Sequence, residues 1–147
     1  MRFAPPQRHP GWTGVREAVQ AGPAVPQAAS RLEQVMGHRV PDWNEYGGLT
    51  VNVHTPLHAL AGGEPRPVLV CWHGGGFTSG SGGWDWYDEG RLAALGDIVV
   101  VTANYRVGPL GYLYLPQISA ADLRGTRAPC CAGSRTTSPP SAATRAT

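Results

Sequence analysis

Two short apolar runs, separated by a glycine-rich loop and a helical pattern, constrain the fold of this chain more than any other feature. Val68–Trp72 and residues 98–103 are continuous apolar runs, which are typical of strands covered on both faces of a sheet. Between them, apolar residues from Tyr87 to Leu95 recur at helical spacing, and Gly96 follows as a candidate C-cap. Strand, loop, helix and strand within about 35 residues predict a βαβ unit and a parallel pair of strands.

A third strand is expected before this unit. Near 49–55 the sequence alternates between apolar and polar residues, as a half-buried strand does. We expect the strands near 49–55, 68–72 and 98–103 to belong to one mixed sheet, with the first on its antiparallel side and the other two flanking it. Residues 1–47 are punctuated by proline and glycine and are expected to form a loop-rich surface layer. The sequence therefore predicts the α/β fold class.

Composition and charge exclude several classes of function. The 147 residues carry a formal net charge of +2, which gives no reason to expect a nucleic acid or an acidic membrane surface as partner. No run approaches the ~18 apolar residues of a membrane span, and no signal-peptide pattern opens the chain. Localisation stays open on these grounds, with a slight preference for the cytoplasm. The chain has three cysteines, Cys71, Cys130 and Cys131. They have neither zinc-ligand spacing nor a CxxC motif, so no metal site is expected.

The loop of residues 72–83, WHGGGFTSGSGG, follows the first apolar run directly. Three consecutive glycines let a backbone approach a ligand closely, and amide N–H groups at a strand end can stabilise the oxyanion of acyl transfer. A Walker-type phosphate loop is excluded, because no Gly-Lys-[Ser/Thr] occurs. A bare glycine triplet would equally suit a flexible loop. His-Gly-Gly-Gly-Phe at a strand end is more specific, because lipases and esterases use this motif for their oxyanion hole.

Four segments, in order, resemble the type-B carboxylesterases, the cholinesterase-like branch of the α/β-hydrolases. They are RFAPPQRHPGWTGVREAVQAGPAVPQ, GGLTVNVHTP, PVLVCWHGGGFTSGSGG and GDIVVVTANYRVGPLGYL. The resemblance runs from Arg2 to about Pro116. It implies that residues 1–122 are a partial α/β-hydrolase domain, an amino-terminal fragment of the central mixed sheet with its oxyanion loop.

The resemblance also assigns roles to residues of the glycine-rich loop. It implies that Gly75 and Gly76 supply two N–H donors of the oxyanion hole, while Gly74 shapes the turn. His73 and Phe77 are expected to support the loop, and His73 is expected to pack and hydrogen-bond rather than to act as a general base. The family's third donor is the residue that follows the nucleophilic serine.

The resemblance also bears on three aromatic residues and one arginine. Trp84, Trp86 and Tyr87 are expected either to line a wall of the acyl or leaving-group pocket or to pack in the core or at the rim. Arg106 follows a buried strand, where an unpaired charge is costly. In the family this arginine pairs with the aspartate of a Phe-Gly-Gly-Asp-Pro segment, which does not occur in this sequence.

The catalytic groups of the family are missing from the sequence. No Gly-x-Ser-x-Gly occurs, and Ser79 and Ser81 belong to the oxyanion loop rather than to a strand–helix elbow. No nucleophile, catalytic acid or catalytic base is therefore predicted in this chain. The family chemistry needs no metal or organic cofactor, and its partner is a small-molecule carboxylic ester; no specific protein partner is evident.

The tail, residues 123–147, differs in composition from the rest. It contains no acidic or aromatic residue and only one large aliphatic side chain, so we expect it to be disordered. The codons for residues 130–147 can be read in a shifted frame, in which each new codon starts at the third base of the printed codon. The printed residues then dictate the last two bases of each new codon, and only its first base is free. With a suitable choice of these first bases, the shifted frame encodes LRWVQDNIAAFGGDPRN. That peptide resembles the family's next helix and its Phe-Gly-Gly-Asp-Pro turn. We therefore expect an out-of-frame tail, with a reading-frame slip near residues 123–130.

Three functions remain open at this point. The first is a serine ester hydrolase that works through an acyl-enzyme, with the present chain inactive on its own because it lacks the nucleophile. The second is a non-catalytic cholinesterase-like interaction protein, although an adhesion role does not need the intact His-Gly-Gly-Gly-Phe loop. The third is a non-functional gene remnant, which accounts for preserved motifs followed by a tail of unrelated composition.

Overall fold

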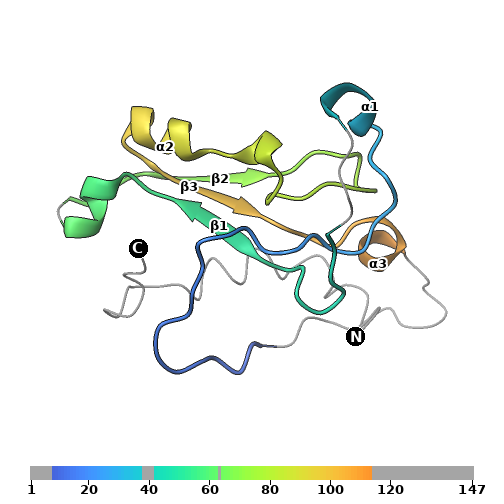
Figure 1. Ribbon diagram of the computed structural model, residues 1–147, viewed down its shortest axis with the longest axis horizontal. Helices are drawn as coiled ribbons and strands as arrows, with labels where there is room; N and C mark the ends of the chain where they lie inside the picture. Colours follow the sequence, from blue (N-terminus) through green and yellow to red (C-terminus); the bar gives the residue numbers. More distant parts are fainter. Residues whose placement is uncertain (1–7, 38–41, 63, 114–147) are drawn as a thin grey trace.

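The computed structural model describes residues 8–37, 42–62 and 64–113, and its centre is a three-stranded sheet (Figure 1). The strands are β1 (Val51–His54), β2 (Val68–Trp72) and β3 (Val99–Ala103). They lie in the order β1-β3-β2, with β1 antiparallel and β2 parallel to β3. One mixed sheet and the antiparallel place of β1 are thereby confirmed.

The position of the middle strand differs from the prediction. β3, rather than β1, lies at the centre, so β2 does not flank the first strand. The cause is the βαβ unit: its crossover makes β2 and β3 direct parallel neighbours, with Val68 opposite Val99, and β1 then pairs with the remaining edge of β3.

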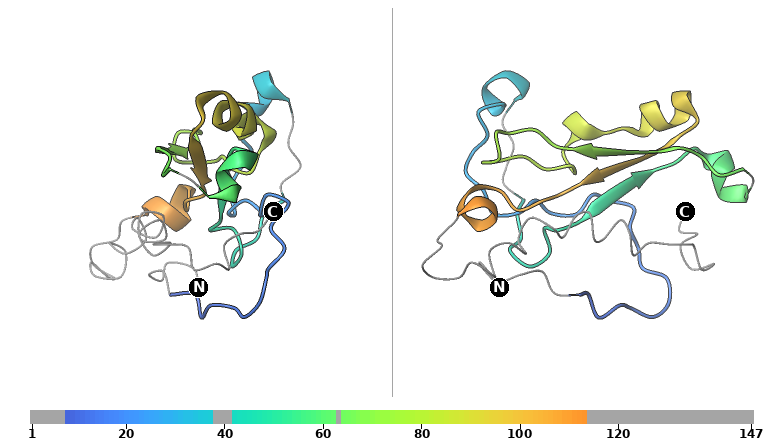
Figure 2. Two further views of the ribbon diagram at one scale, coloured as in Figure 1. Left: turned by 90° about the vertical axis from the view of Figure 1, so that its left-hand side faces the viewer. Right: turned by 180° about the vertical axis from the view of Figure 1, so that it is seen from behind.

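Helix α2 (Gly90–Gly96) provides the crossover and contacts β3. It lies along one side of the sheet, whereas residues 8–20 run along the opposite side (Figures 1 and 2). Ala93 of α2 and Val100 of β3 are both fully buried, which places the small hydrophobic core between helix and sheet. The buried apolar residues are Ala24, Val25, Ala93, Val100, Ala103 and Val107.

The ends of this helix differ from the prediction of a helix over residues 87–95 that ends at Gly96. A 3-10 turn, η2 (Asp85–Tyr87), comes first, and Asp88 then adopts an extended backbone before α2 begins. The carboxylate of Asp88 accepts the Gly90 N–H at 3.2 Å, which satisfies one amide of the first turn. At the other end the cap is Asp97, which adopts the left-handed conformation (φ 49°) tolerated by aspartate.

The remaining elements are short. Residues before β1 contain helix α1 (Glu33–Met36) and, in their described part, one isolated bridge between Ala24 and Trp43, as expected of a loop-rich layer. A 3-10 turn, η1 (Leu57–Ala61), follows β1, and helix α3 (Gly108–Tyr112) follows β3. No helix among the described residues has the length and apolar character that crossing a membrane requires.

The two apolar strands are covered to different extents. In β3 the side chains are buried or half-buried, as the sequence predicts. In β2 the prediction of cover on both faces is wrong, because Val68, Leu69, Val70 and Trp72 remain exposed. β2 is the edge strand of the described sheet, so only one neighbouring strand shields it. The predictions for residues 123–147 lie outside the described residues.

Candidate functional site: the glycine-rich loop

The loop of residues 73–83 begins at the carboxyl end of β2, the edge where open α/β sheets bind their ligands. Three consecutive residues take positive φ values: Gly75 (125°), Gly76 (60°) and Phe77 (63°). A Cβ on Gly75 would lie 2.0 Å from the carbonyl oxygen of Ser79, so only glycine fits there. Phe77, a non-glycine residue in this strained region, keeps its conformation while its carbonyl accepts the Gly108 N–H at 2.7 Å.

The amides of Gly75 and Gly76 are the donors that the sequence assigns to an oxyanion. Neither N–H has an acceptor among the residues that the structure describes. Gly75 is half-buried and Gly76 is exposed, so a ligand atom can reach this part of the loop. Two adjacent amide donors without an acceptor in residues 8–37, 42–62 and 64–113 form an arrangement suited to a carbonyl oxygen that gains negative charge.

The direction of each donor is set by a bond on the other side of its peptide plane. The Gly74 carbonyl accepts a hydrogen bond from His73 Nδ1 at 2.9 Å. The Gly75 carbonyl accepts from the Thr78 N–H at 3.1 Å and from the Thr78 hydroxyl at 3.0 Å. In a planar trans peptide the N–H points opposite to the carbonyl, so these bonds orient the N–H groups of Gly75 and Gly76.

His73 is buried beneath the loop. Its ring stacks on Tyr105 with centroids 4.2 Å apart and planes 8° from parallel. Burial lowers the pKa of the His73 imidazole, so the ring is neutral at pH 7. Because the Gly74 carbonyl can only accept, Nδ1 carries the proton and Nε2 has no partner in the described part of the chain. The geometry agrees with a supporting role rather than with a general base.

Two tyrosine hydroxyls bind the peptide that enters the loop. Tyr87 accepts the Gly74 N–H at 2.7 Å, and Tyr105 donates to the His73 carbonyl at 2.8 Å. The sequence analysis expected Tyr87 either to line a pocket wall or to pack in the core or at the rim; the structure shows its hydroxyl bound to the loop backbone, and the pocket role stays a prediction. Tyr105 was missed, although it belongs to the Asn-Tyr-Arg segment that follows β3.

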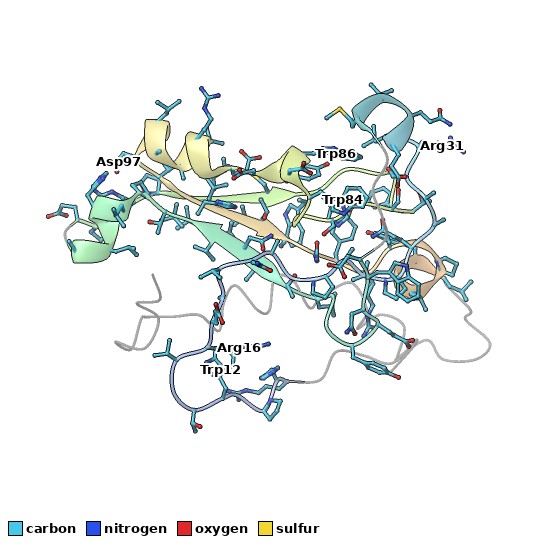
Figure 3. All side chains as sticks on the ribbon, in the orientation of Figure 1. Trp12, Arg16, Arg31, Trp84, Trp86 and Asp97 are labelled. Atoms are coloured by element: carbon cyan, nitrogen blue, oxygen red, sulfur yellow. The ribbon has the colours of Figure 1, made fainter. Side chains whose placement is uncertain are left out.

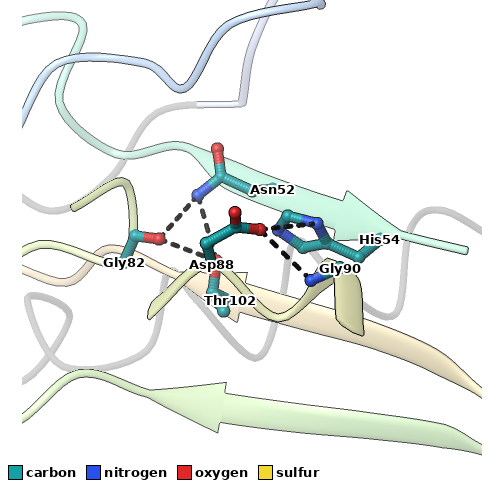
Figure 4. Close-up of polar contacts among 6 residues, drawn as sticks. All are labelled: Asn52, His54, Gly82, Asp88, Gly90 and Thr102. Atoms are coloured by element: carbon teal, nitrogen blue, oxygen red, sulfur yellow. Dashed lines mark hydrogen bonds and ion pairs between the residues drawn. The ribbon is translucent and has the colours of Figure 1, made fainter. Parts of the chain in front are cut away.

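The carboxyl-terminal part of the loop is fixed by side chains from distant segments. Gln27 accepts the Gly80 N–H at 2.5 Å and donates to the Gly80 carbonyl at 2.9 Å. The Gly82 carbonyl accepts from Asn52 Nδ2 and from the Thr102 hydroxyl, each at 2.9 Å (Figure 4). The loop is therefore tied both to the amino-terminal layer and to β1 and β3.

Asn104, directly after β3, connects these parts. Its Oδ1 accepts from the Gly82 N–H at 2.8 Å and from the Ser81 hydroxyl at 3.2 Å. Its Nδ2 lies 3.0 Å from the Gly48 carbonyl and 3.2 Å from the Pro23 carbonyl. Sequence reasoning missed Asn104, and the signal available was a polar residue at the end of a buried apolar strand.

The two loop serines do not have the surroundings of a nucleophile. Ser79 is 2% exposed and Ser81 is 1% exposed. The Ser81 hydroxyl donates to Asn104 and accepts the Gly83 N–H at 3.1 Å, so it is committed to the structure of the loop. That neither serine acts as the nucleophile stays a prediction.

The aromatic and basic candidates lie around the loop without forming one cluster. Trp84 and Trp86 are half-buried, pack edge to face at 4.8 Å, and lie well apart from Asp97 (Figure 3). Phe77 packs against Tyr112 with ring centroids 5.0 Å apart. Arg106 is half-buried. The partner segment expected for Arg106 is absent from the sequence, so that pairing stays a prediction.

The histidine–carboxylate contacts lie away from the glycine pair. His54 Nδ1 is 3.9 Å from Asp88 beside the first residue of α2 (Figure 4), and His58 Nε2 is 2.9 Å from Asp97. The carboxyl pKa of Asp97 is lowered, mainly by the hydrogen bond from Arg66. In the described residues no group of three or more His, Cys, Asp or Glu side chains could hold a metal ion.

Comparison with known proteins decides the family. A family model described as the carboxylesterase family matches residues 1–123. This chain belongs to the carboxylesterase family. A probable N-octanoylanthranilate hydrolase of Rhodococcus erythropolis is 48% identical over 123 residues, which cover 83% of this chain and 27% of that protein. Phenmedipham hydrolase of Pseudarthrobacter oxydans is 44% identical over 115 residues, or 77% of this chain and 22% of that protein.

Solved structures of the family confirm the partial α/β-hydrolase fold. A thermophilic pNB esterase superimposes with a TM-score of 0.70 at 38% identity, over 82% of this chain and 24% of that chain. A carboxylesterase of Geobacillus stearothermophilus gives a TM-score of 0.66 at 40% identity, over 85% of this chain and 24% of that chain. The chain thus spans about a quarter of the length of the relatives that it matches.

Proposed function

We propose that this carboxylesterase chain supplies the oxyanion-binding part of a serine hydrolase for carboxylic esters. The observation that carries the proposal is the pair of amide N–H groups at Gly75 and Gly76, which have no acceptor in the described part of the chain. Each N–H belongs to a peptide whose carbonyl accepts a hydrogen bond from His73 or Thr78. The hydrolase names of the two bacterial relatives support ester or related acyl substrates.

The proposed chemistry follows from these donors. The ester carbonyl oxygen accepts hydrogen bonds from the N–H groups of Gly75 and Gly76. A serine from outside the described residues attacks the carbonyl carbon, and the negative charge that develops on the oxygen is stabilised by the two amides and a third donor after that serine. The bond from the carbonyl carbon to the alcohol oxygen breaks, and the alcohol leaves with the proton that the serine hydroxyl gives up; water then hydrolyses the acyl-enzyme, which releases the acid and restores the serine hydroxyl.

The composition of the tail, residues 123–147, supports a second part of the proposal, which concerns the reading frame. The family match ends at residue 123, where the composition of the sequence changes. This coincidence supports a reading-frame slip between residues 123 and 130. We propose that restoring the frame restores the family sequence downstream, including the serine elbow.

The decisive experiment removes one donor atom without changing a side chain. In a frame-restored gene product, Gly76 is replaced by glycolic acid, which exchanges the amide N–H for an ester oxygen. We expect kcat for p-nitrophenyl esters to fall about 10²–10³-fold, the usual effect of losing one oxyanion donor. The same replacement at Gly14, which also has a positive φ and open space around it, is the control and should leave kcat unchanged. An unaltered kcat at Gly76 would refute the assignment.

A further inference from the structure

A single peptide unit, between His73 and Gly74, is held by two tyrosine hydroxyls that come from different elements. Tyr87, at the end of η2, accepts the Gly74 N–H at 2.7 Å, and Tyr105, after β3, donates to the His73 carbonyl at 2.8 Å. Both polar groups of this peptide are thus paired with side chains 13 and 32 residues away from the residues they bind. Neither tyrosine has a role in the chemistry described above.

The same tyrosines also hold the His73 ring. Tyr105 stacks on the imidazole at 4.2 Å, and Tyr87 approaches it edge to face at 6.4 Å. The ring orientation places Nδ1 against the Gly74 carbonyl at 2.9 Å. Since that carbonyl and the Gly75 N–H share one planar peptide, the position of the imidazole fixes the direction of the Gly75 donor.

We propose that Tyr87 and Tyr105 are positioning residues for the oxyanion donors, acting through His73 on the Gly75 amide. This inference rests on the proposed esterase function for its kinetic consequence, and on the described contacts alone for its structural one. The hydroxyls have opposite roles: Tyr87 must present an acceptor, whereas Tyr105 must present a donor.

The first test uses Tyr87→Phe and Tyr105→Phe in the frame-restored enzyme, because phenylalanine keeps the ring contacts and removes only the hydroxyl. We expect kcat to fall about 10–100-fold with KM changed less than about threefold, as small displacements of catalytic groups cost this much. Tyr46→Phe, at a side chain that is 80% exposed, is the matched control. An unchanged kcat in both variants, or a loss carried by KM, would overturn the proposal.

The second test distinguishes positioning from a general loss of structure. Incorporation of 4-aminophenylalanine at position 105 presents N–H donors to the His73 carbonyl and should restore most of the kcat lost in Tyr105→Phe. The same residue at position 87 presents only a weak acceptor to the Gly74 N–H and should restore little. Equal rescue at both positions, or rescue at neither, would contradict the assigned hydrogen-bond directions.

The third test is independent of catalysis. Hydrogen–deuterium exchange is measured at the Gly74 amide in the full 147-residue chain fused to a soluble carrier. We expect Tyr87→Phe to accelerate exchange at Gly74 at least about tenfold, and Tyr46→Phe to have no effect. If the frame-restored parent lacks esterase activity, the proposed function fails, and this measurement still decides whether the Tyr87 hydroxyl holds the loop. Unchanged exchange in Tyr87→Phe would refute that part of the proposal.

Discussion

Asn104→Ala should destabilise the fold more than any other single polar truncation around the loop. The side chain is buried and its amide joins the loop to the amino-terminal layer. Truncation leaves the Gly82 N–H without its acceptor at 2.8 Å and the Gly48 carbonyl without its donor at 3.0 Å. Each buried polar group left unsatisfied costs about 1–3 kcal/mol, so the free energy of unfolding should fall by about 2–6 kcal/mol.

The assay is urea unfolding of dilute protein, followed by the fluorescence of Trp84 and Trp86 beside the loop. With an m value of about 1–3 kcal/mol/M, a loss near 4 kcal/mol lowers the midpoint by about 2 M. Asn44→Ala is the matched control. Asn44 also accepts two backbone N–H groups, from Tyr46 at 2.8 Å and Gly47 at 2.9 Å, but it is exposed, so water replaces the lost acceptor.

Asn104→Asp separates the two halves of the amide. The carboxylate keeps an acceptor for the Gly82 N–H but places an oxygen opposite the carbonyls of Gly48 and Pro23. Its destabilisation should therefore equal or exceed that of Asn104→Ala. If Asn104→Ala costs no more than Asn44→Ala, within about 0.5 kcal/mol, the reasoning from buried unsatisfied groups is refuted for this site.

Three further predictions follow from the same geometry. In the frame-restored enzyme, Gly75→Ala should reduce kcat at least about tenfold more than Gly76→Ala. A Cβ on Gly75 would collide with the Ser79 carbonyl, whereas alanine at position 76 costs only the left-handed strain of about 1–2 kcal/mol. Equal losses of kcat in steady-state kinetics would contradict this. Burial lowers the His73 pKa, so the unfolded chain binds the proton more readily and the free energy of unfolding should fall as pH drops below about 6.5. The urea midpoint should therefore decrease with falling pH in the parent but not in His73→Gln. An identical pH dependence in both proteins would exclude His73 as the cause. The 147-residue chain should not hydrolyse p-nitrophenyl esters above background, and turnover that phenylmethylsulfonyl fluoride abolishes would return Ser79 and Ser81 to consideration.

The strands and the turn after β2 could be predicted because each follows from a pattern of neighbouring residues. Apolar runs marked β2 and β3, alternation marked β1, and the glycine triplet marked the turn after β2. The order of the strands was only partly predicted, since the pattern of β1 specifies a half-buried strand but not its neighbour. Helix ends were misplaced, because the Asp88 carboxylate binds the Gly90 N–H and Asp97 adopts the left-handed conformation, and periodicity encodes neither feature.

Most side chains that hold the candidate site in place could not be predicted from the sequence. Gln27 and Gly80 are 53 residues apart, and Asn104 and Pro23 are 81 residues apart, yet each pair is joined by a hydrogen bond. Such contacts arise only when the chain has folded, and no composition or spacing rule brings these partners together. Motif reasoning names the residues that present donors, and the structure adds the side chains that aim them.

Local and distant contributions to the donor geometry can be separated. The planes that carry the Gly75 and Gly76 amides are fixed by His73 and Thr78, which belong to the loop itself. The exposed side chains of β2, by contrast, lack cover in the described residues. Because a hydrogen bond within the loop does not depend on cover over β2, the donor arrangement rests on residues 73–79 and on the two tyrosines that hold His73, Tyr87 and Tyr105. For the proposed oxyanion hole, a catalytic serine has to be delivered to a preformed pair of donors, and the activity of any frame-restored protein should depend on where its serine elbow lies relative to Gly75 and Gly76.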